Sequence, residues 1–128
     1  MNRLRLISLC CPMICACSDG KNAAARDKLC SGYQPGAPFS ASEFLRKGTE
    51  LGMDSTMITL DAAPTGFTDT EVIALKTMTG PTLSLCEAID RDKVSGKALA
   101  SAGSPMHHTC AVQFAGGQVK SVVAKDFD

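Results

Sequence analysis

The sequence predicts an α+β fold: one small domain with one or two helices packed on a short antiparallel sheet that ends in a C-terminal hairpin. Three segments predict it. Residues 41–51 have the apolar spacing of an amphipathic helix, and residues 57–60 form a short β-branched run. Residues 109–124 contain two β-prone runs around a Gly-Gly pair.

The helix predicted over residues 41–51 begins at a capping box, because Ser40 is followed three residues later by Glu43. Phe39, just before the cap, can act as a hydrophobic staple. The apolar side of the helix is formed by Phe44, Leu45, Gly48 and Leu51. Gly52 can then end the helix.

The segment Met57–Leu60 is predicted as a strand, since it is β-branched and bounded by turn-forming residues. Thr68 and Glu71 repeat the capping pattern. Residues 72–78 then fit a helix and a strand equally well, because they are apolar, short and rich in β-formers.

Residues 82–89 are predicted as a strand and residues 90–93 as a solvated turn, whereas residues 97–102 fit either type of element. The clearest β signal comes last. Residues 109–114 and 119–124 flank a turn whose two glycines accept positive φ, which predicts a hairpin.

The first seventeen residues have the features of an export signal. Arg3 and Arg5 precede an apolar run at residues 6–14, which is too short to span a bilayer. The ending Ile14-Cys15-Ala16-Cys17 resembles the lipobox of bacterial lipoproteins. The resemblance implies that Cys17 receives a diacylglyceryl group, that the peptide is cut before it, and that the new amino terminus is acylated.

Two or three acyl chains would hold the protein stably on a membrane. In the lipoprotein family an Asp directly after the lipidated cysteine commonly retains the protein in the inner membrane. Ser18 occupies that place here, so the resemblance favours the periplasmic face of the outer membrane. We therefore expect a signal peptide at residues 1–16, a lipidated N-terminus and flexible tether at residues 17–38, and the folded domain at residues 39–128.

The mature chain is close to neutral. Removing Arg3 and Arg5 with the signal leaves 11 Lys and Arg against 13 Asp and Glu, a formal charge of −2. No basic cluster stands out, so we do not expect nucleic-acid binding. A membrane, reached through the lipid, and an envelope protein are the expected partners, and no cofactor is expected.

Besides Cys17, the mature chain has Cys30, Cys86 and Cys110, in a compartment that oxidises thiols. Cys86 and Cys110 lie in apolar, β-prone stretches, so we predict a disulfide between them, worth about 3 kcal/mol in the chain-entropy account. Pairing of Cys30 with either one is the alternative, because spacing alone does not fix connectivity.

Two reactive sites are conceivable near the C-terminus. The run Met106-His107-His108-Thr109-Cys110 holds possible copper or zinc ligands, but adjacent histidines of a strand point to opposite faces, so we predict no metal. Cys86 or Cys110 could pair with a histidine as a nucleophile, yet an exported thiol tends to oxidise. We predict no catalytic residues.

The paired carboxylates are predicted to be solvated surface groups and not an acid and base pair; they are Asp90 with Asp92 and Asp126 with Asp128.

Residues 68–72, 80–82 and 112–119 are similar to stretches of the small lipoproteins that accompany the outer-membrane protein assembly machine, although the spacing differs. No role is carried over from that similarity.

These observations favour a non-enzymatic docking or accessory module of the envelope. An inhibitor or ligand-binding lipoprotein is the alternative, and an enzyme is a third possibility. A docking module should present an apolar patch on its sheet, whereas an inhibitor should present an exposed loop, for which residues 95–105 are the candidate.

Overall fold

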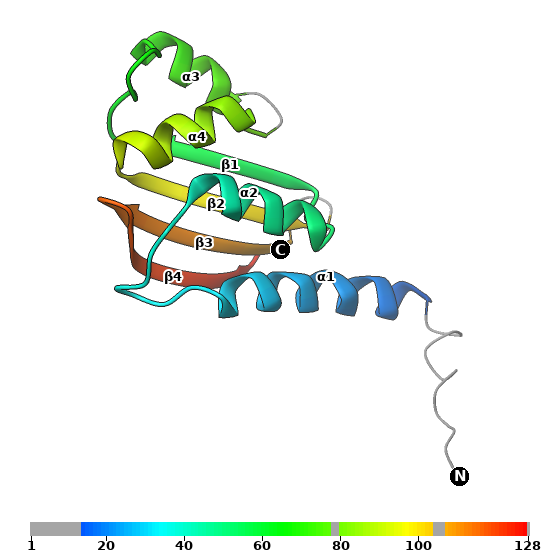
Figure 1. The fold of residues 1–128 in the computed structure, drawn as a ribbon. Coiled ribbons are helices and arrows are strands. Elements are labelled where there is room, and N and C mark those ends of the chain that lie inside the picture. Colours follow the sequence, from blue (N-terminus) through cyan, green and yellow to red (C-terminus); the bar gives the residue numbers. More distant parts are fainter. Residues whose placement is uncertain (1–13, 78–79, 104–106, 128) are drawn as a thin grey trace.

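Helices and strands form two layers in the computed structural model, which describes residues 14–77, 80–103 and 107–127 (Figure 1). In chain order the elements are α1 (Ile14–Ser31), α2 (Ala41–Glu50), β1 (Ser55–Leu60), α3 (Asp69–Thr77), α4 (Leu83–Asp92), β2 (Gly96–Ala102), β3 (His108–Ala115) and β4 (Gln118–Asp126). The described strands form one antiparallel sheet in the order β1-β2-β3-β4. The α+β fold with its C-terminal hairpin is confirmed.

The capping signals locate α2 and α3 correctly. The hydroxyl of Ser40 accepts the Glu43 N–H at 3.2 Å, and the ring of Phe39 packs against that of Phe44 with centroids 5.9 Å apart. At α3 the bonds are reciprocal, since Thr68 N–H donates to Glu71 Oε1 at 2.8 Å and Glu71 N–H donates to Thr68 Oγ1 at 3.1 Å. Of the two alternatives for residues 72–78, the helix is the correct one through Thr77.

The strand predicted for residues 82–89 is wrong, because this segment is helix α4. Thr82 caps it, with its Oγ1 accepting the Leu85 N–H at 3.1 Å. The buried Leu85, Cys86 and Ile89 have helical spacing and point toward the core. A short apolar run fits both the two-residue period of a strand and the 3.6-residue period of a helix. Here the Thr82 cap and the buried helical face favour the helix.

The hairpin of β3 and β4 turns at Gly116 and Gly117, whose φ values are +60° and +80°. Two positive φ values in succession give a turn that matches the twist of the strands. Residues 97–102, which fitted either type of element, belong to β2 and pair with both β1 and β3.

The core lies between the sheet and the helices. Alternate residues of each strand face the helices, and on β2 these are the fully buried Ala98, Ala100 and Ala102. Their small side chains let α2 approach closely, and a Cβ added at Gly48 would lie only 3.8 Å from the Cβ of Ala100. Tyr33, Phe39, Phe44 and Phe114 fill the neighbouring space as one aromatic cluster.

The flexible tether predicted for residues 17–38 is wrong in the structure. Residues through Ser31 form α1, which packs across β3 and touches β2 and β4, and its N-terminal end extends past the sheet (Figure 1). Residues 36–39 pair with the start of β4, for example through Gly36 N–H to the Val119 carbonyl at 2.8 Å. The fold therefore begins before residue 39, because Leu29, Cys30 and Tyr33 supply buried apolar side chains within a mostly polar segment.

Candidate functional site

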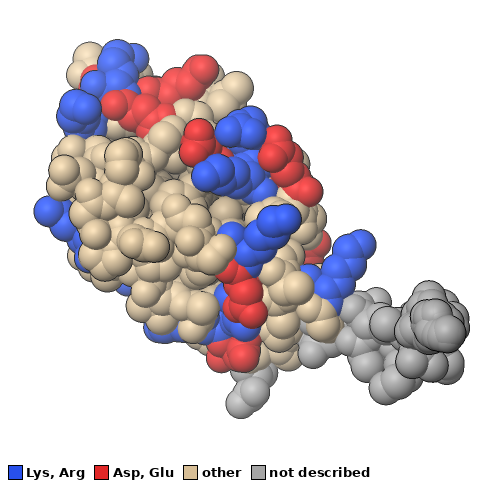
Figure 2. Space-filling view, turned by 60° about the horizontal axis from the view of Figure 1, so that its bottom comes forward, with Lys and Arg blue, Asp and Glu red and all other residues tan. Residues whose placement is uncertain are grey.

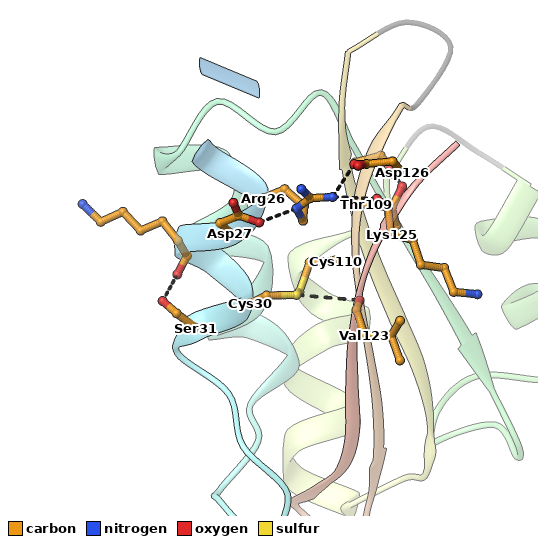
Figure 3. Close-up of a disulfide and its surroundings, with 11 residues drawn as sticks. Arg26, Asp27, Cys30, Ser31, Thr109, Cys110, Val123, Lys125 and Asp126 are labelled. Carbon is orange, nitrogen blue, oxygen red and sulfur yellow. Dashed lines mark hydrogen bonds and ion pairs between the residues drawn. A yellow bond between two sulfur atoms is a disulfide. The ribbon is translucent and has the colours of Figure 1, made fainter. Parts of the chain in front are cut away.

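A disulfide joins α1 to the middle of the sheet. Cys30 and Cys110 are bonded, with Cα atoms 5.6 Å apart, although they lie 80 positions apart in sequence (Figure 3). The predicted Cys86–Cys110 bridge is therefore wrong, and the alternative in which Cys30 takes part is right. The reason is topological: Cys110 lies on the face of β3 that α1 covers, and α1 brings Cys30 against it.

Cys86 is a free, fully buried thiol in α4. Burial raises its pKa to about 12, with further contributions from the charges of Asp90 and Glu87. A thiol with this pKa stays protonated at neutral pH, and the sulfur of Cys110 is held in the disulfide. Neither cysteine can therefore serve as the nucleophile of a cysteine–histidine pair in this state.

An ionic cluster lies beside the disulfide. Arg26 of α1 is 8% exposed and donates from Nη1 to Asp126 Oδ1 at 2.6 Å and to the Lys125 carbonyl at 2.8 Å (Figure 3). The same carboxylate oxygen lies 2.9 Å from His108 Nδ1. Asp126 is a surface group as predicted, with a side chain that is 64% exposed, and its carboxylate also connects α1 to the end of β4. Asp128 lies outside the described residues.

The hydrogen bond from His108, and then that from Arg26, lowers the pKa of Asp126. A carboxylate with a lowered folded-state pKa stabilises the fold above its unfolded pKa of about 3.9, and this contribution is lost as the pH falls through the folded value.

Asp126→Asn should therefore be less stable than wild type at pH 7, and the curves of stability against pH for the two proteins should converge below about pH 4. Thermal unfolding from pH 2.5 to 7 checks this. A constant difference across that range would contradict it, and Asp61→Asn, an exposed carboxylate away from the cluster, is the control.

The residues considered as metal ligands do not converge. His107 Nδ1 donates to the Phe127 carbonyl at 2.6 Å, whereas His108 contacts Asp126 on the helix side of the sheet. Cys110 is in the disulfide, and Met106 lies outside the described residues. Within residues 14–77, 80–103 and 107–127, no three His, Cys, Asp or Glu side chains are placed to hold a metal ion.

Asp90 and Asp92 were predicted to lie in a solvated turn, but they end α4 and bind neighbouring segments. Asp90 accepts from the Ser40 hydroxyl at 2.9 Å, from Ala41 N–H at 2.6 Å, and from both the N–H and the hydroxyl of Ser42. It therefore holds the N-terminus of α2 against α4. Hydrogen bonds from Arg91 and from the Thr65 N–H hold the pKa of Asp92 far below its usual value.

The sheet face turned away from the helices presents a line of apolar side chains. Met57, Leu99, Ala111 and Val123 are partners in register on the four successive strands, and we call them the apolar row. Met57 is 40% exposed and Val123 is 43% exposed. An apolar patch on the sheet is the feature expected of a docking module.

The loop expected of an inhibitor is only partly described. Residues 96–102 of that candidate segment form β2, which lies between β1 and β3 and is not a projecting loop. Residues 104–106 lie outside the described part of the chain. The described portion of the segment therefore gives no projecting surface to enter a target cleft.

For Cys17, the expected lipidation site, the structure describes only the backbone. Cys17 belongs to the first turns of α1, and its side chain lies outside the described part of the structure. No helix among the described residues combines the length and apolarity needed to cross a bilayer.

Charged groups of both signs are interspersed on the face shown in Figure 2, beside a broad uncharged area. That face therefore has no extended basic surface of the kind that nucleic-acid binding requires. Comparison of the chain with models of protein families, with curated proteins and with solved structures finds no match.

Proposed function

We propose that this protein is a lipid-anchored accessory module of the bacterial envelope that acts by docking rather than by catalysis. The observation that carries the proposal is the disulfide between Cys30 and Cys110. Structural disulfides form and persist mainly in oxidising compartments such as the periplasm. The same destination follows from the export signal at residues 1–16 and from the lipobox resemblance at Cys17.

The geometry of α1 gives the anchor a second role, which is to restrict the orientation of the domain on the membrane. Cys17 and Cys30 lie 13 positions apart in one helix, a rise of about 20 Å at about 1.5 Å per residue. The disulfide and the Arg26–Asp126 ion pair fasten the second half of that helix to the sheet. In place of a flexible tether, a stiff element would connect the lipid to the domain and restrict its orientation on the membrane.

Anchoring raises the effective concentration of the domain near membrane-resident partners. A domain held in few orientations would present the same surface repeatedly toward such partners. Ser18, directly after Cys17, favours the outer membrane as the place where this occurs.

Cys17→Ala is the direct test of the anchor. We expect palmitate label to enter the wild-type protein and the Cys15→Ala control, because only the sulfur at position 17 has the lipobox context. The Cys17→Ala protein should incorporate no label and should either enter the soluble periplasmic fraction or stay unprocessed. Labelling of Cys17→Ala at the wild-type level, or its retention on the membrane at mature size, would contradict the proposal.

A further inference from the structure

We infer that the sheet face turned away from the helices, which we call the open face, docks a protein partner. The partner offers an apolar strip bordered by acidic side chains. This inference rests on the proposed docking function and names the surface and the class of partner. The apolar row forms the centre of the face. Its borders on β2 and β4 carry Lys97 and Lys125, which lie two residues from Leu99 and from Val123, on opposite sides of the row.

The charge on this face has one sign. Asp126 is the only acidic residue in strands β1 to β4, and it lies on the opposite side of the sheet, where Arg26 and His108 bind it. In the described part of the chain neither Lys97 nor Lys125 forms an ion pair. The complementary surface is therefore apolar at its centre and negative at its edge.

The rest of the face is polar, and it is covered on the line of Lys125, where Ser101 and Thr109 are only 5% and 2% exposed. Thr59, Gln113 and Ser121 share a register line with Lys97 and provide hydroxyl and amide groups beside the apolar row. An apolar centre with a polar rim is the usual anatomy of a protein–protein interface. The row offers two exposed large apolar side chains, Met57 and Val123, with Leu99 and Ala111 half-buried between them, whereas insertion into a lipid surface relies on a larger apolar face.

The size of the face excludes a stable symmetric dimer as the main occupant. Four strands spaced about 4.8 Å apart, open over about four residues each at about 3.3 Å, cover about 250 Å². A standard interface buries about 800 Å² on each partner. A second copy would also bring together two faces that both carry positive charge. The partner is therefore a different protein, and its binding is weak enough to depend on the effective concentration that the lipid anchor supplies.

The test uses a photoreactive amino acid in the full-length protein in cells of the producing bacterium. It is placed at Met57 or Val123 on the open face, and in matched controls at Ile73 or Leu83, which are both 57% exposed but lie on α3 and α4. We expect one crosslinked protein from the open-face positions only. Mass spectrometry of the crosslinked peptide should show apolar residues adjacent to Asp or Glu.

Charge reversal tests the role of the lysines. Lys97→Glu with Lys125→Glu should lower the crosslinking yield by about fivefold or more, because attraction becomes repulsion. The same change at the exposed Lys21 and Lys28 of α1 should leave the yield within about twofold. All four positions are exposed, so thermal unfolding should show each variant folded as in wild type.

Four results would overturn the inference: crosslinks to a second copy of this chain, crosslinks to phospholipid, yields equal to those of the control positions, or insensitivity to reversal of Lys97 and Lys125. The palmitate label, read separately, distinguishes failure of the anchor from failure of the docking face. Crosslinking to an acidic partner without palmitate label would overturn the proposed lipid anchor and leave the docking face intact.

Discussion

Replacing Cys30 and Cys110 together by alanine is expected to lower the free energy of unfolding by about 4 kcal/mol. The disulfide closes a loop across 80 positions of the chain, and in the chain-entropy account loops of this length stabilise by about 4–5 kcal/mol. The substitution also releases α1 from the sheet, since Arg26 and its partners then hold that helix without a covalent link. An effect of this size is a large fraction of the stability of a small domain.

Thermal and denaturant unfolding of the purified protein, with and without a reducing agent, measures this effect. Wild type should lose stability on reduction, and the double alanine variant should be insensitive to it. Cys86→Ala is the matched control, because it removes a buried sulfur that belongs to no bridge. It should keep the sensitivity to reduction, and loss of that sensitivity in Cys86→Ala would show that the bridge is assigned to the wrong pair.

The second large effect is expected for Phe44→Ala, at about 3–5 kcal/mol. Phe44 is fully buried, and its ring lies 5.6 Å from that of Tyr33 and 5.9 Å from that of Phe39, measured between centroids. Its removal leaves a cavity where α2, the segment after α1 and the sheet meet. Urea unfolding measures the change in free energy.

Phe127→Ala is the control for Phe44→Ala. Phe127 is 46% exposed at the end of β4, so truncation there should cost less than about 1 kcal/mol. Equal effects for the two variants would mean that the aromatic cluster is not the centre of the core.

The parts of the fold that sequence predicts well are those decided by neighbouring residues. The capping box at Ser40 and Glu43 fixes the start of α2 through one local hydrogen bond and a staple. The Gly116-Gly117 pair fixes the hairpin, because few other residues accept two successive positive φ values. Both signals act without reference to the rest of the chain.

The errors come from choices that depend on distant residues. Residues 82–89 satisfy both a strand and a helix pattern, and the decision follows from the buried face that Leu85, Cys86 and Ile89 make with the rest of the core. Likewise, residues 17–38 are rich in small and polar residues, so their composition predicts a tether. Leu29, Cys30 and Tyr33 recur there at helical spacing, a signal that average composition conceals.

The candidate docking surface could be predicted from the sequence only in part. Sequence alternation indicates which residues of each strand share a face, as with Met57 and Thr59 of β1. Only the strand order and register place Met57, Leu99, Ala111 and Val123 in one line. The disulfide partner of Cys110 required the same information, because α1 reaches β3 only in the folded arrangement.

The helix that carries Cys17 is covalently fastened to the sheet, and tryptic mapping of the protein under non-reducing conditions tests this most directly. Cleavage after Lys and Arg places Cys30, Cys86 and Cys110 in separate peptides, residues 29–46, 77–91 and 98–120. We predict a linked pair of residues 29–46 and 98–120, with residues 77–91 released as a free thiol peptide. A linkage between residues 77–91 and 98–120 would contradict it.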